Sequence, residues 1–400
     1  MTDVPTAIAA TAAEASAAAV AGSTPDGSDT ASDTTSTQQQ VAASRTHGSF
    51  HPLRVGDVER LTPDAVAVTF EVPDELREAY AFTAGQHLTL RTTIDGEEVR
   101  RSYSICSPPS AGRLRVAVKL LEGGAFSGHA NTGLDVGDEL DVMVPAGRFG
   151  VALDPQQSRR YAAIVAGSGI TPVMSVLGAV LEAEAGSTFT LVYGNRDSGS
   201  VMFVEELEDL KDRYATRLQL MHVLSREPQD AELLHGRIDE AKLERLLDEV
   251  VRPEDVDEWL LCGPFAMVQQ VHATLVARGV PKPQIHLELF HVDGEQPRMA
   301  RRTTTGESGT TRVTVRLDGR SSTFAMPEEG SVLDATLAVR ADAPFACKGG
   351  VCGTCRAKLV EGEVEMARNY ALEPEELEAG FVLACQSVPT TPTLVLDFDA

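Results

Sequence analysis

The sequence predicts a multidomain protein: a small antiparallel β-barrel, then an α/β domain with a parallel sheet, then an α+β domain of the β-grasp type. Its length of 400 residues exceeds what a single hydrophobic core organises. Near Arg159 the pattern changes from short alternating runs to strands that alternate with helices. A polar stretch without periodicity, residues 293–311, is typical of a linker.

These changes set the predicted domain boundaries. The N-terminal stretch is rich in Ala, Ser and Thr and has no Lys or Arg before Arg45. It therefore predicts disorder, with a transient helix over Ile8–Val20, and not a secretory signal. The expected segments are a disordered tail (1–48), the barrel (49–155), the α/β domain (156–292), the linker (293–311) and the C-terminal domain (312–400).

Each domain has its own element pattern. Short runs between turn residues predict barrel strands at Ala65–Val72, His87–Thr93, Leu114–Leu120 and Glu139–Val144. Longer apolar runs predict buried parallel strands at Tyr161–Ala166, Phe189–Tyr193, Leu218–Leu224 and Trp259–Cys262, with helices at Pro172–Glu184 and Ala266–Arg278. The C-terminal pattern predicts a hairpin (Val313–Leu317, Ser322–Met326), a helix over Ser331–Arg340 with Ser331 as N-cap, and strands at Arg356–Leu359 and Leu394–Phe398.

Composition limits the classes of function. A net charge of −24 argues against a nucleic-acid partner, because phosphate binding needs a basic face. No apolar run is long enough to cross a bilayer, so no membrane association is expected. Six cysteines in so long a chain do not form a disulfide scaffold, and free thiols are typical of a reducing, cytoplasmic compartment.

Four cysteines carry the strongest signal. Cys347, Cys352 and Cys355 have the spacing C-x4-C-x2-C inside a glycine-rich loop, and Cys385 follows after 29 further residues. This is the spacing that holds a plant-type 2Fe–2S cluster. A tetrahedral zinc site is the alternative, although such sites usually pair two C-x2-C knuckles and this chain has one.

Two further strings predict nucleotide sites. The loop Gly167–Pro172 lies between a strand and a helix, where backbone N–H groups bind a pyrophosphate. The next strands end in Arg196 and in Ser225-Arg226, and no acidic residue stands there, which favours NADPH over NADH. In the barrel, Arg101–Ile105 offers a cation, an aromatic ring and a hydroxyl for a flavin, and Gly123–Ser127 offers backbone donors for its diphosphate.

The domain order and these strings, with Cys262-Gly263-Pro264, resemble the ferredoxin–NADP reductase superfamily. From about Phe50 to the C-terminus, strings such as Leu234–Asp239 and Asn369–Leu377 resemble the reductase components of ring-epoxidising phenylacetyl-CoA monooxygenases. The resemblance implies that FAD is bound by Arg101, Tyr103, Ser104, Ile105, Gly124 and Ser127, with Phe290 beside the ring. It implies that NADPH is bound by Gly167, Gly169, Thr171, Arg196, Ser225, Arg226 and Gly263, that Ser104, Cys262 and Glu288 lie at the reacting centre, and that the four cysteines ligate the cluster.

The implied function is an NADPH-dependent oxidoreductase that passes electrons through FAD and the cluster to the oxygenase subunits of a multicomponent di-iron monooxygenase in phenylacetate degradation. Two alternatives stay open. One is the reductase of another aromatic or alkane hydroxylase. The other is a redox-sensing or interaction module without turnover.

Overall fold

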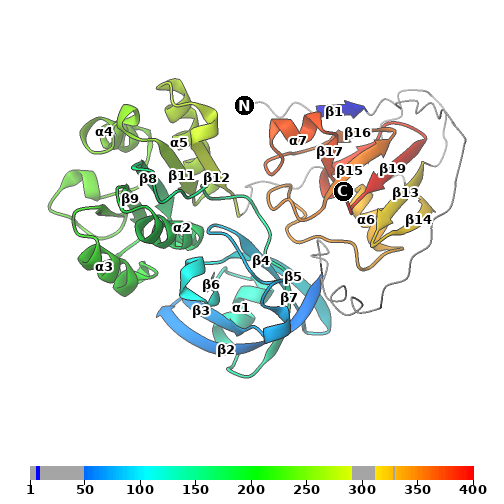
Figure 1. The fold of residues 1–400 in the computed structure, drawn as a ribbon, viewed down its shortest axis with the longest axis horizontal. Helices are drawn as coiled ribbons and strands as arrows, with labels where there is room; N and C mark the ends of the chain where they lie inside the picture. Colours follow the sequence, from blue (N-terminus) through cyan, green and yellow to red (C-terminus); the bar gives the residue numbers. More distant parts are fainter. Residues whose placement is uncertain (1–5, 10–48, 291–310, 328) are drawn as a thin grey trace, which may run out of the picture.

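The structure, a computed structural model, describes residues 6–9, 49–290, 311–327 and 329–400. Figure 1 shows three domains. Two of them have one sheet each, and the C-terminal domain has a five-stranded sheet and part of a three-stranded one. We call them the barrel domain (elements β2 to β7), the central domain (β8 to β12) and the C-terminal domain (β13 to β19). The predicted multidomain architecture, with an antiparallel, a parallel and a mixed C-terminal sheet, is confirmed.

The barrel domain is a six-stranded antiparallel sheet in the order β5-β4-β7-β2-β3-β6. The two edges of this sheet approach each other at the isolated bridge between Ile105 and Val116, so the sheet curls into a half-barrel. Helix α1 (Ala125–Thr132) places Phe126 in the core that the strands enclose. The strands are β2 (Phe50–Thr62), β3 (Ala65–Glu71), β4 (His87–Ile94), β5 (Glu97–Ser104), β6 (Leu114–Lys119) and β7 (Glu139–Met143).

The central domain has a fully parallel sheet in the order β10-β9-β8-β11-β12. The chain starts in the middle, moves outward to one edge, and returns to the other side of β8. The connection after β8 therefore leads toward one edge of the sheet, and the connection after the neighbouring strand β11 leads toward the other edge. Open α/β sheets bind ligands at such a point, where the strand order reverses. The strands are β8 (Arg160–Ala166), β9 (Thr188–Asn195), β10 (Leu218–Leu224), β11 (Glu258–Cys262) and β12 (Ile285–Glu288), and the helices α2 (Ile170–Ala183), α3 (Val204–Arg213), α4 (Glu240–Glu249) and α5 (Phe265–Ala277).

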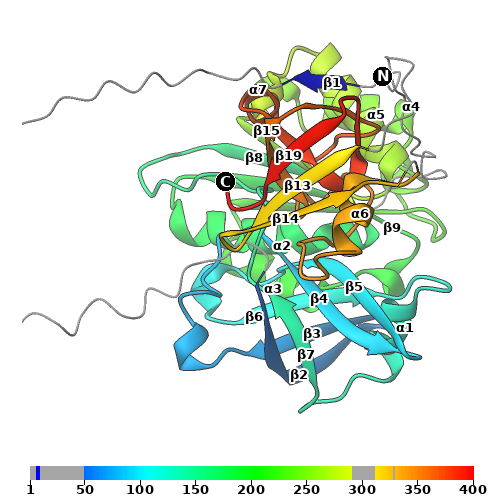
Figure 2. The same cartoon turned by 90° about the vertical axis from the view of Figure 1, so that its right-hand side faces the viewer.

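The C-terminal domain has a five-stranded sheet in the order β14-β13-β19-β15-β17, which Figure 2 views with the barrel domain below it. Ser331 caps helix α6 as predicted, because its hydroxyl accepts from the Asp334 N–H at 3.1 Å. The elements are β13 (Arg312–Leu317), β14 (Arg320–Ala325), α6 (Val332–Leu337), β15 (Arg356–Glu361), β16 (Glu363–Met366), α7 (Pro374–Glu378), β17 (Phe381–Leu383), β18 (Ser387–Pro389) and β19 (Thr393–Asp397).

Some details differ from the sequence prediction. Helix α2 starts at Ile170, so Pro172 is its third residue; the first-turn N–H groups lack intrahelical partners, so proline is tolerated there too. Of the predicted tail, the structure describes only Thr6–Ala9, which form strand β1 against β16, so the helix expected from Ile8 onward is wrong at Ile8 and Ala9. The rest of the tail and residues 293–310 of the predicted linker lie outside the described residues.

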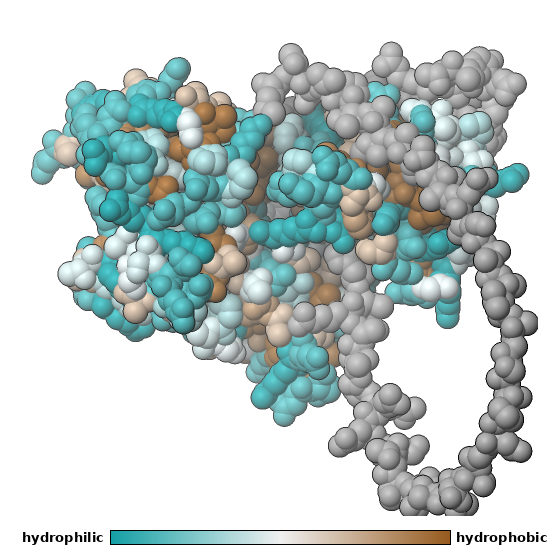
Figure 3. Space-filling model, turned by 45° about the horizontal axis from the view of Figure 1, so that its top comes forward, coloured by the Kyte–Doolittle hydropathy of each residue, from teal (hydrophilic) through white to brown (hydrophobic). Residues whose placement is uncertain are grey.

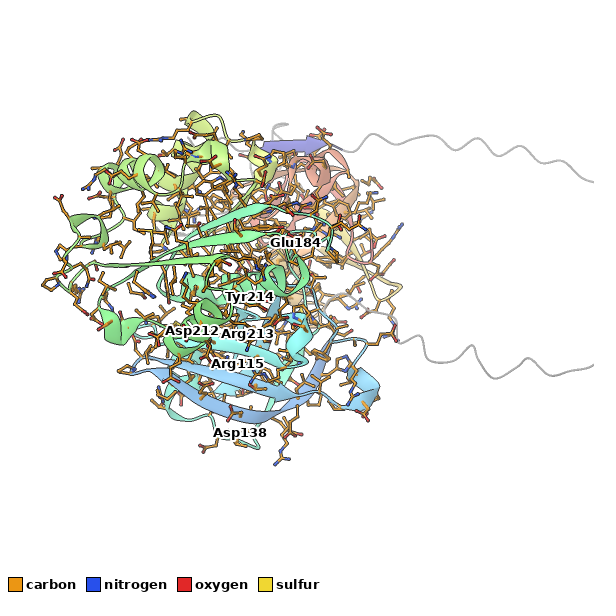
Figure 4. The ribbon with its side chains drawn as sticks, turned by 60° about the vertical axis from the view of Figure 1, so that its left-hand side comes forward. Arg115, Asp138, Glu184, Asp212, Arg213 and Tyr214 are labelled. Atoms are coloured by element: carbon orange, nitrogen blue, oxygen red, sulfur yellow. The ribbon has the colours of Figure 1, made fainter. Side chains whose placement is uncertain are left out.

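A buried arginine joins the barrel domain to the central domain. Arg115, on β6, has a side chain that is 5% exposed, and it donates to Glu206 of α3 at 2.7 Å and to Glu59 of β2 at 2.5 Å. Figure 4 labels Arg115 at the boundary between the barrel domain and the central domain. Glu206 and the ring of Phe203, whose centroid lies 5.4 Å from the Arg115 guanidinium carbon, are at the start of α3. Among the described residues, no helix is long and apolar enough to span a bilayer.

Candidate functional site

A cavity of about 2870 Å³ lies where the three domains meet, and residues of all three line it. Figure 3 shows a largely hydrophilic surface on the central domain, on the left. The cavity is lined by residues of the edge strand β5, of the loops after β8, β9, β10 and β11, and of the loop that carries Cys347. The functional side chains predicted from sequence are therefore expected to line this cavity.

Strand β5 forms the barrel wall of the cavity. It is an edge strand, so its outer backbone groups are available to a ligand. Arg101, Tyr103 and Ser104 all line the cavity. Tyr103 packs against Phe126 with ring centroids 5.3 Å apart, and burial raises its pKa, so its phenol stays neutral. Arg101 is exposed, and its guanidinium has only one hydrogen bond among the described residues, to the Arg100 carbonyl at 2.7 Å.

Ser104 connects the barrel domain to Glu288 of the central domain. The Ser104 hydroxyl donates to Glu288 Oε2 at 3.0 Å. Glu288 ends β12 directly beside Cys262, which ends the parallel strand β11. Burial raises the pKa of Glu288 to about 8, and burial together with the neighbouring Glu288 raises the pKa of Cys262 well above its usual value. A carboxyl that is protonated at neutral pH thus stands at the wall of the cavity, and the thiol lies behind it, fully buried.

The glycine loop after β8 brings a helix N-terminus to the cavity. Gly167 has φ +56°, the left-handed region that glycine adopts without strain. At Gly169 a Cβ atom would lie 2.3 Å from the Cys262 carbonyl oxygen, so only glycine lets the loops after β8 and β11 approach this closely. Thr171 donates its hydroxyl to the Ser168 carbonyl at 3.0 Å. Backbone N–H groups and the dipole of α2 therefore face a site suited to a pyrophosphate.

The loops after β9 and β10 supply arginines to the same cavity. Arg196 pairs with Asp64 of the barrel domain at 2.7 Å. The N–H of Arg226 donates to the Arg196 carbonyl at 2.7 Å, so the two loops run side by side. Arg237, which sequence reasoning did not select, lines the cavity next to Ser225 and Arg226. In the described part of the chain no hydrogen bond or ion pair occupies the guanidinium groups of Arg226 and Arg237, so both are available to an anion.

Arg237 could have been found from its context. It follows Gly236, which has φ +97°, in a loop whose His235 makes a parallel bridge to Leu224 at the end of β10. A basic residue next to a glycine in a loop was the available signal, and only the fold places it on the cavity wall with Arg226.

Gly124 and Ser127 build the turn that starts α1. The Ser127 hydroxyl accepts from the Leu121 N–H and donates to the Gly124 carbonyl, both at 3.1 Å. Gly124 lines a smaller cavity of about 550 Å³, and Leu121 lines both cavities. Ser127 is buried behind this turn, so its own atoms shape the backbone and do not form the cavity wall.

The predicted cluster cysteines come together in two pairs. The Cys352 thiol donates to Cys347 and lowers the Cys347 pKa to about 6, together with backbone N–H groups of Gly349, Val351 and Cys352. Cys355 lies in hydrogen-bond contact with Cys385, and this contact and burial raise the Cys355 pKa. Cys347 and Cys352 are half-buried and line the cavity, whereas Cys355 and Cys385 are buried.

This two-by-two arrangement fits a binuclear cluster. Each iron of a 2Fe–2S cluster takes two thiolates, and the contacts Cys347–Cys352 and Cys355–Cys385 provide two pairs of them. Lys348, with φ 51°, and Gly350 and Gly353, with φ 80° and 68°, bend the loop so that the Gly349 N–H approaches Cys347 Sγ at 3.3 Å.

The cavity thus unites most, but not all, of the predicted site. On its walls lie the backbone or side chains of Arg101, Tyr103, Ser104, Gly167, Thr171, Arg196, Ser225, Arg226, Gly263, Glu288, Phe290, Cys347 and Cys352. Ile105, Gly124, Ser127, Gly169, Cys262, Cys355 and Cys385 lie outside its lining. Phe290, 40% exposed, is the last described residue before 291–310.

Comparison with known proteins agrees with the geometry. Residues 52–150 match an oxidoreductase FAD-binding domain, residues 163–273 an oxidoreductase NAD-binding domain, and residues 315–390 a 2Fe-2S iron-sulfur cluster binding domain. Among curated proteins, the chain is 48% identical to a subunit of the 1,2-phenylacetyl-CoA epoxidase of Escherichia coli, over 88% of this chain and 98% of that protein. It is 35% identical to the ferredoxin reductase component of 3-ketosteroid-9-alpha-monooxygenase of Rhodococcus rhodochrous, with the same coverage.

Among solved structures, phthalate dioxygenase reductase matches with a TM-score of 0.53 and 25% identity over 87% of this chain and 98% of that chain. That structure is described as modular, for electron transfer from pyridine nucleotides to a 2Fe–2S centre. The chain belongs to the family of oxidoreductases that serve as reductase components of multicomponent oxygenases and carry FAD-binding, NAD-binding and 2Fe–2S domains.

Proposed function

We propose that the protein takes electrons from NADPH and delivers them to the oxygenase subunits of a di-iron monooxygenase, the phenylacetyl-CoA epoxidase of phenylacetate degradation. The observation that carries the proposal is one cavity lined by three kinds of predicted site. These are strand β5, which we call the flavin wall, the glycine loop after β8, and the cysteines Cys347 and Cys352. Its size accommodates more than one cofactor, since ordinary ligand pockets measure about 300–1,000 Å³.

Each of the three domains would hold one of the three redox groups. When bound, NADPH supplies a hydride, FAD exchanges electron pairs for single electrons, and the 2Fe–2S cluster, near about −400 mV, carries them singly. The chain supplies binding and orientation. Tyr103 and Ser104 would hold the flavin ring, Arg101 and the Gly124 turn its diphosphate, and the four cysteines the cluster.

Glu288 and Ser104 would control protons at the reacting centre. Because burial raises the Glu288 pKa to about 8, its carboxyl keeps a proton at neutral pH. The Ser104 hydroxyl donates to Glu288, and Ser104 would lie beside the flavin ring. Cys262 and Gly263 shape the floor on which a nicotinamide would lie, and the buried Cys262 thiol stays protonated there.

NADPH is proposed over NADH because of the free arginines. Arg226 and Arg237 lie on the cavity wall beside Ser225, after β10. Asn195 and Arg196 stand at the end of β9, where an NADH-specific site has an acidic residue. Arg196 is less available, since Asp64 already neutralises it. Two planar guanidinium groups suit the bidentate recognition of a 2′-phosphate.

The choice of partner rests on the relative that is 48% identical along nearly its whole length, which is named as a subunit of 1,2-phenylacetyl-CoA epoxidase. A second candidate partner is another oxygenase, because a relative at 35% identity is named as the reductase component of a 3-ketosteroid monooxygenase. A cytoplasmic location is proposed because all six cysteines are free and four of them are to ligate iron.

The proposal is tested in two stages. Anaerobic titration with NADPH should bleach the flavin and then the cluster, and a cluster that stays oxidised would contradict the electron path. Turnover of phenylacetyl-CoA should then require this protein together with the purified oxygenase subunits of the epoxidase, and aromatic hydroxylase subunits should not replace them. A redox sensor without turnover would instead give negligible NADPH-dependent reduction of cytochrome c.

A further inference from the structure

The C-terminal domain is held against the flavin wall by a contact immediately before the cluster loop, and this contact carries a further inference. Arg100 of β5 lies with its guanidinium carbon 4.2 Å from the ring centroid of Phe345. The same side chain donates from Nη2 to the Ala341 carbonyl at 3.4 Å. Phe345 precedes the first cluster cysteine, Cys347, by two residues, and Arg100 precedes the predicted flavin ligand Arg101 by one.

Arg100 depends on the C-terminal domain for much of its burial. Its side chain is only 5% exposed, although it lies on an edge strand. Glu98, on the same strand, accepts from its Nε at 2.7 Å, which neutralises the charge but covers one side only. Its distance to Phe50 of the barrel domain, 5.4 Å, is longer than the distance to Phe345. Phe345 and Ala341, both from the C-terminal domain, therefore complete the environment of this arginine.

Two weaker contacts fix the same orientation from other sides. Arg148, in the loop after β7, pairs with Glu376 of α7 at 2.7 Å, although the Arg148 side chain is 57% exposed. Phe265, at the start of α5, meets Tyr370 edge to face with centroids 5.7 Å apart. The Arg100–Phe345 contact differs from both because its cation is buried, although Phe345 is half-buried, and because it adjoins the cysteine loop.

We propose that Arg100 and Phe345 are positioning residues, which hold the cluster loop against the flavin wall in the arrangement that accepts electrons. The inference rests on the proposed function and adds a residue pair to it. A guanidinium over an aromatic face, desolvated as here, is a strong and geometrically specific contact. Because the pair joins two domains, its loss should lower the docked population and leave each domain folded.

The experiment uses the full chain with flavin and cluster bound. Phe345→Leu keeps the apolar volume and removes the aromatic face, Phe345→Tyr keeps the face, and Arg100→Lys keeps the charge and removes the planar stack. The matched control is Arg91→Gln, because Arg91 also stacks on a ring, Phe50 at 4.2 Å, but within the barrel domain alone. Stopped-flow spectroscopy follows flavin reduction by NADPH and, separately, the later reduction of the cluster.

Phe345→Leu removes the aromatic face, and Arg100→Lys removes the planar guanidinium together with its hydrogen bond to the Ala341 carbonyl. Each is expected to slow cluster reduction roughly tenfold, while flavin reduction keeps its rate. Phe345→Tyr and Arg91→Gln should behave like the wild type. The double variant should be no slower than either single variant, because both remove one contact. Hydrogen exchange of the residues 341–346, measured before any NADPH is added, should rise in the two single variants.

Unchanged cluster reduction and unchanged hydrogen exchange in Arg100→Lys would overturn the inference, whatever Phe345→Leu does to iron retention. Arg100 lies outside the cysteine loop, so its variant stays informative if the Phe345 variant loses iron. Failure of the wild type to reduce its cluster would instead refute the proposed function, so the two failures are distinguishable.

Discussion

Ser104 and Glu288 lie 184 positions apart in the chain and are joined by a hydrogen bond of 3.0 Å. The bond connects the edge strand of the barrel domain to the last strand of the parallel sheet, so it marks the point where the two nucleotide-binding domains share one site. Its consequences for protonation can be measured directly.

Replacement of Glu288 by Gln is expected to remove a pH-dependent loss of stability. The Glu288 pKa is about 8 when folded and near 4.5 in a model peptide, so between these values the folded protein binds the extra proton. The free energy of unfolding contributed by this carboxyl therefore falls as pH rises from about 4.5 to about 8, and is constant above.

Thermal melts across this range should show the advantage of Glu288→Gln over the wild type growing with pH and levelling off near pH 8. Ser104→Ala should move that plateau to higher pH, because the Ser104 hydrogen bond lowers the Glu288 pKa. A difference between Glu288→Gln and the wild type that does not change with pH would show that the carboxyl is not protonated in the folded protein.

Loss of one thiolate should abolish the cluster. Cys385→Ser is expected to reduce bound iron from about two atoms per chain to near zero and to remove the visible cluster bands, since all four thiolates are needed. Cys106→Ser is the control: its thiol is also buried and free, but it lies in the barrel domain and donates to the Arg115 carbonyl at 3.3 Å, which a hydroxyl can also do. Equal iron content in the two variants would contradict the assignment.

The free arginines should determine the choice between NADPH and NADH. Arg226→Ala and Arg237→Ala are each expected to raise the KM for NADPH by about 10–100-fold, the size of a lost charge-assisted contact, and to leave the KM for NADH nearly unchanged. Arg213→Ala, on the exposed end of α3 and outside the cavity lining, serves as the control. Steady-state kinetics with both nucleotides decides this, and a parallel loss with NADH would argue against 2′-phosphate binding.

The buried Arg115 should contribute to the packing of the barrel domain on the central domain. Arg115→Met leaves Glu59 and Glu206 without their shared partner, and about 2–3 kcal/mol is expected to be lost from the first unfolding transition in urea. Arg54→Met is the matched control, because the Arg54–Glu71 pair on the surface is 3.8 Å apart and mostly exposed, and its loss should cost less than about 1 kcal/mol. Equal losses in the two variants would mean that burial does not strengthen the Arg115 contacts.

Local sequence was sufficient for the features whose chemistry depends on close neighbours in the chain. The spacing of Cys347, Cys352 and Cys355 predicts a metal-binding loop because three thiols lie within nine residues, and residues 315–390 match a 2Fe-2S iron-sulfur cluster binding domain. The loop at Gly167–Gly169 lies between a strand and helix α2 as expected. Most strands were predicted within one or two residues, since buried parallel strands are continuous apolar runs, and β10 has the predicted bounds Leu218–Leu224.

The tertiary structure decided everything that depends on distant segments meeting. Only the sheet order makes Cys262 and Glu288 neighbours. Only the domain packing joins Ser104 to Glu288 and pairs Arg196 with Asp64, and only docking of the C-terminal domain brings Phe345 over Arg100. A single sequence records residue types and spacing along the chain. Distances between segments far apart in that order are set by packing, and these distances assemble one cavity from three domains.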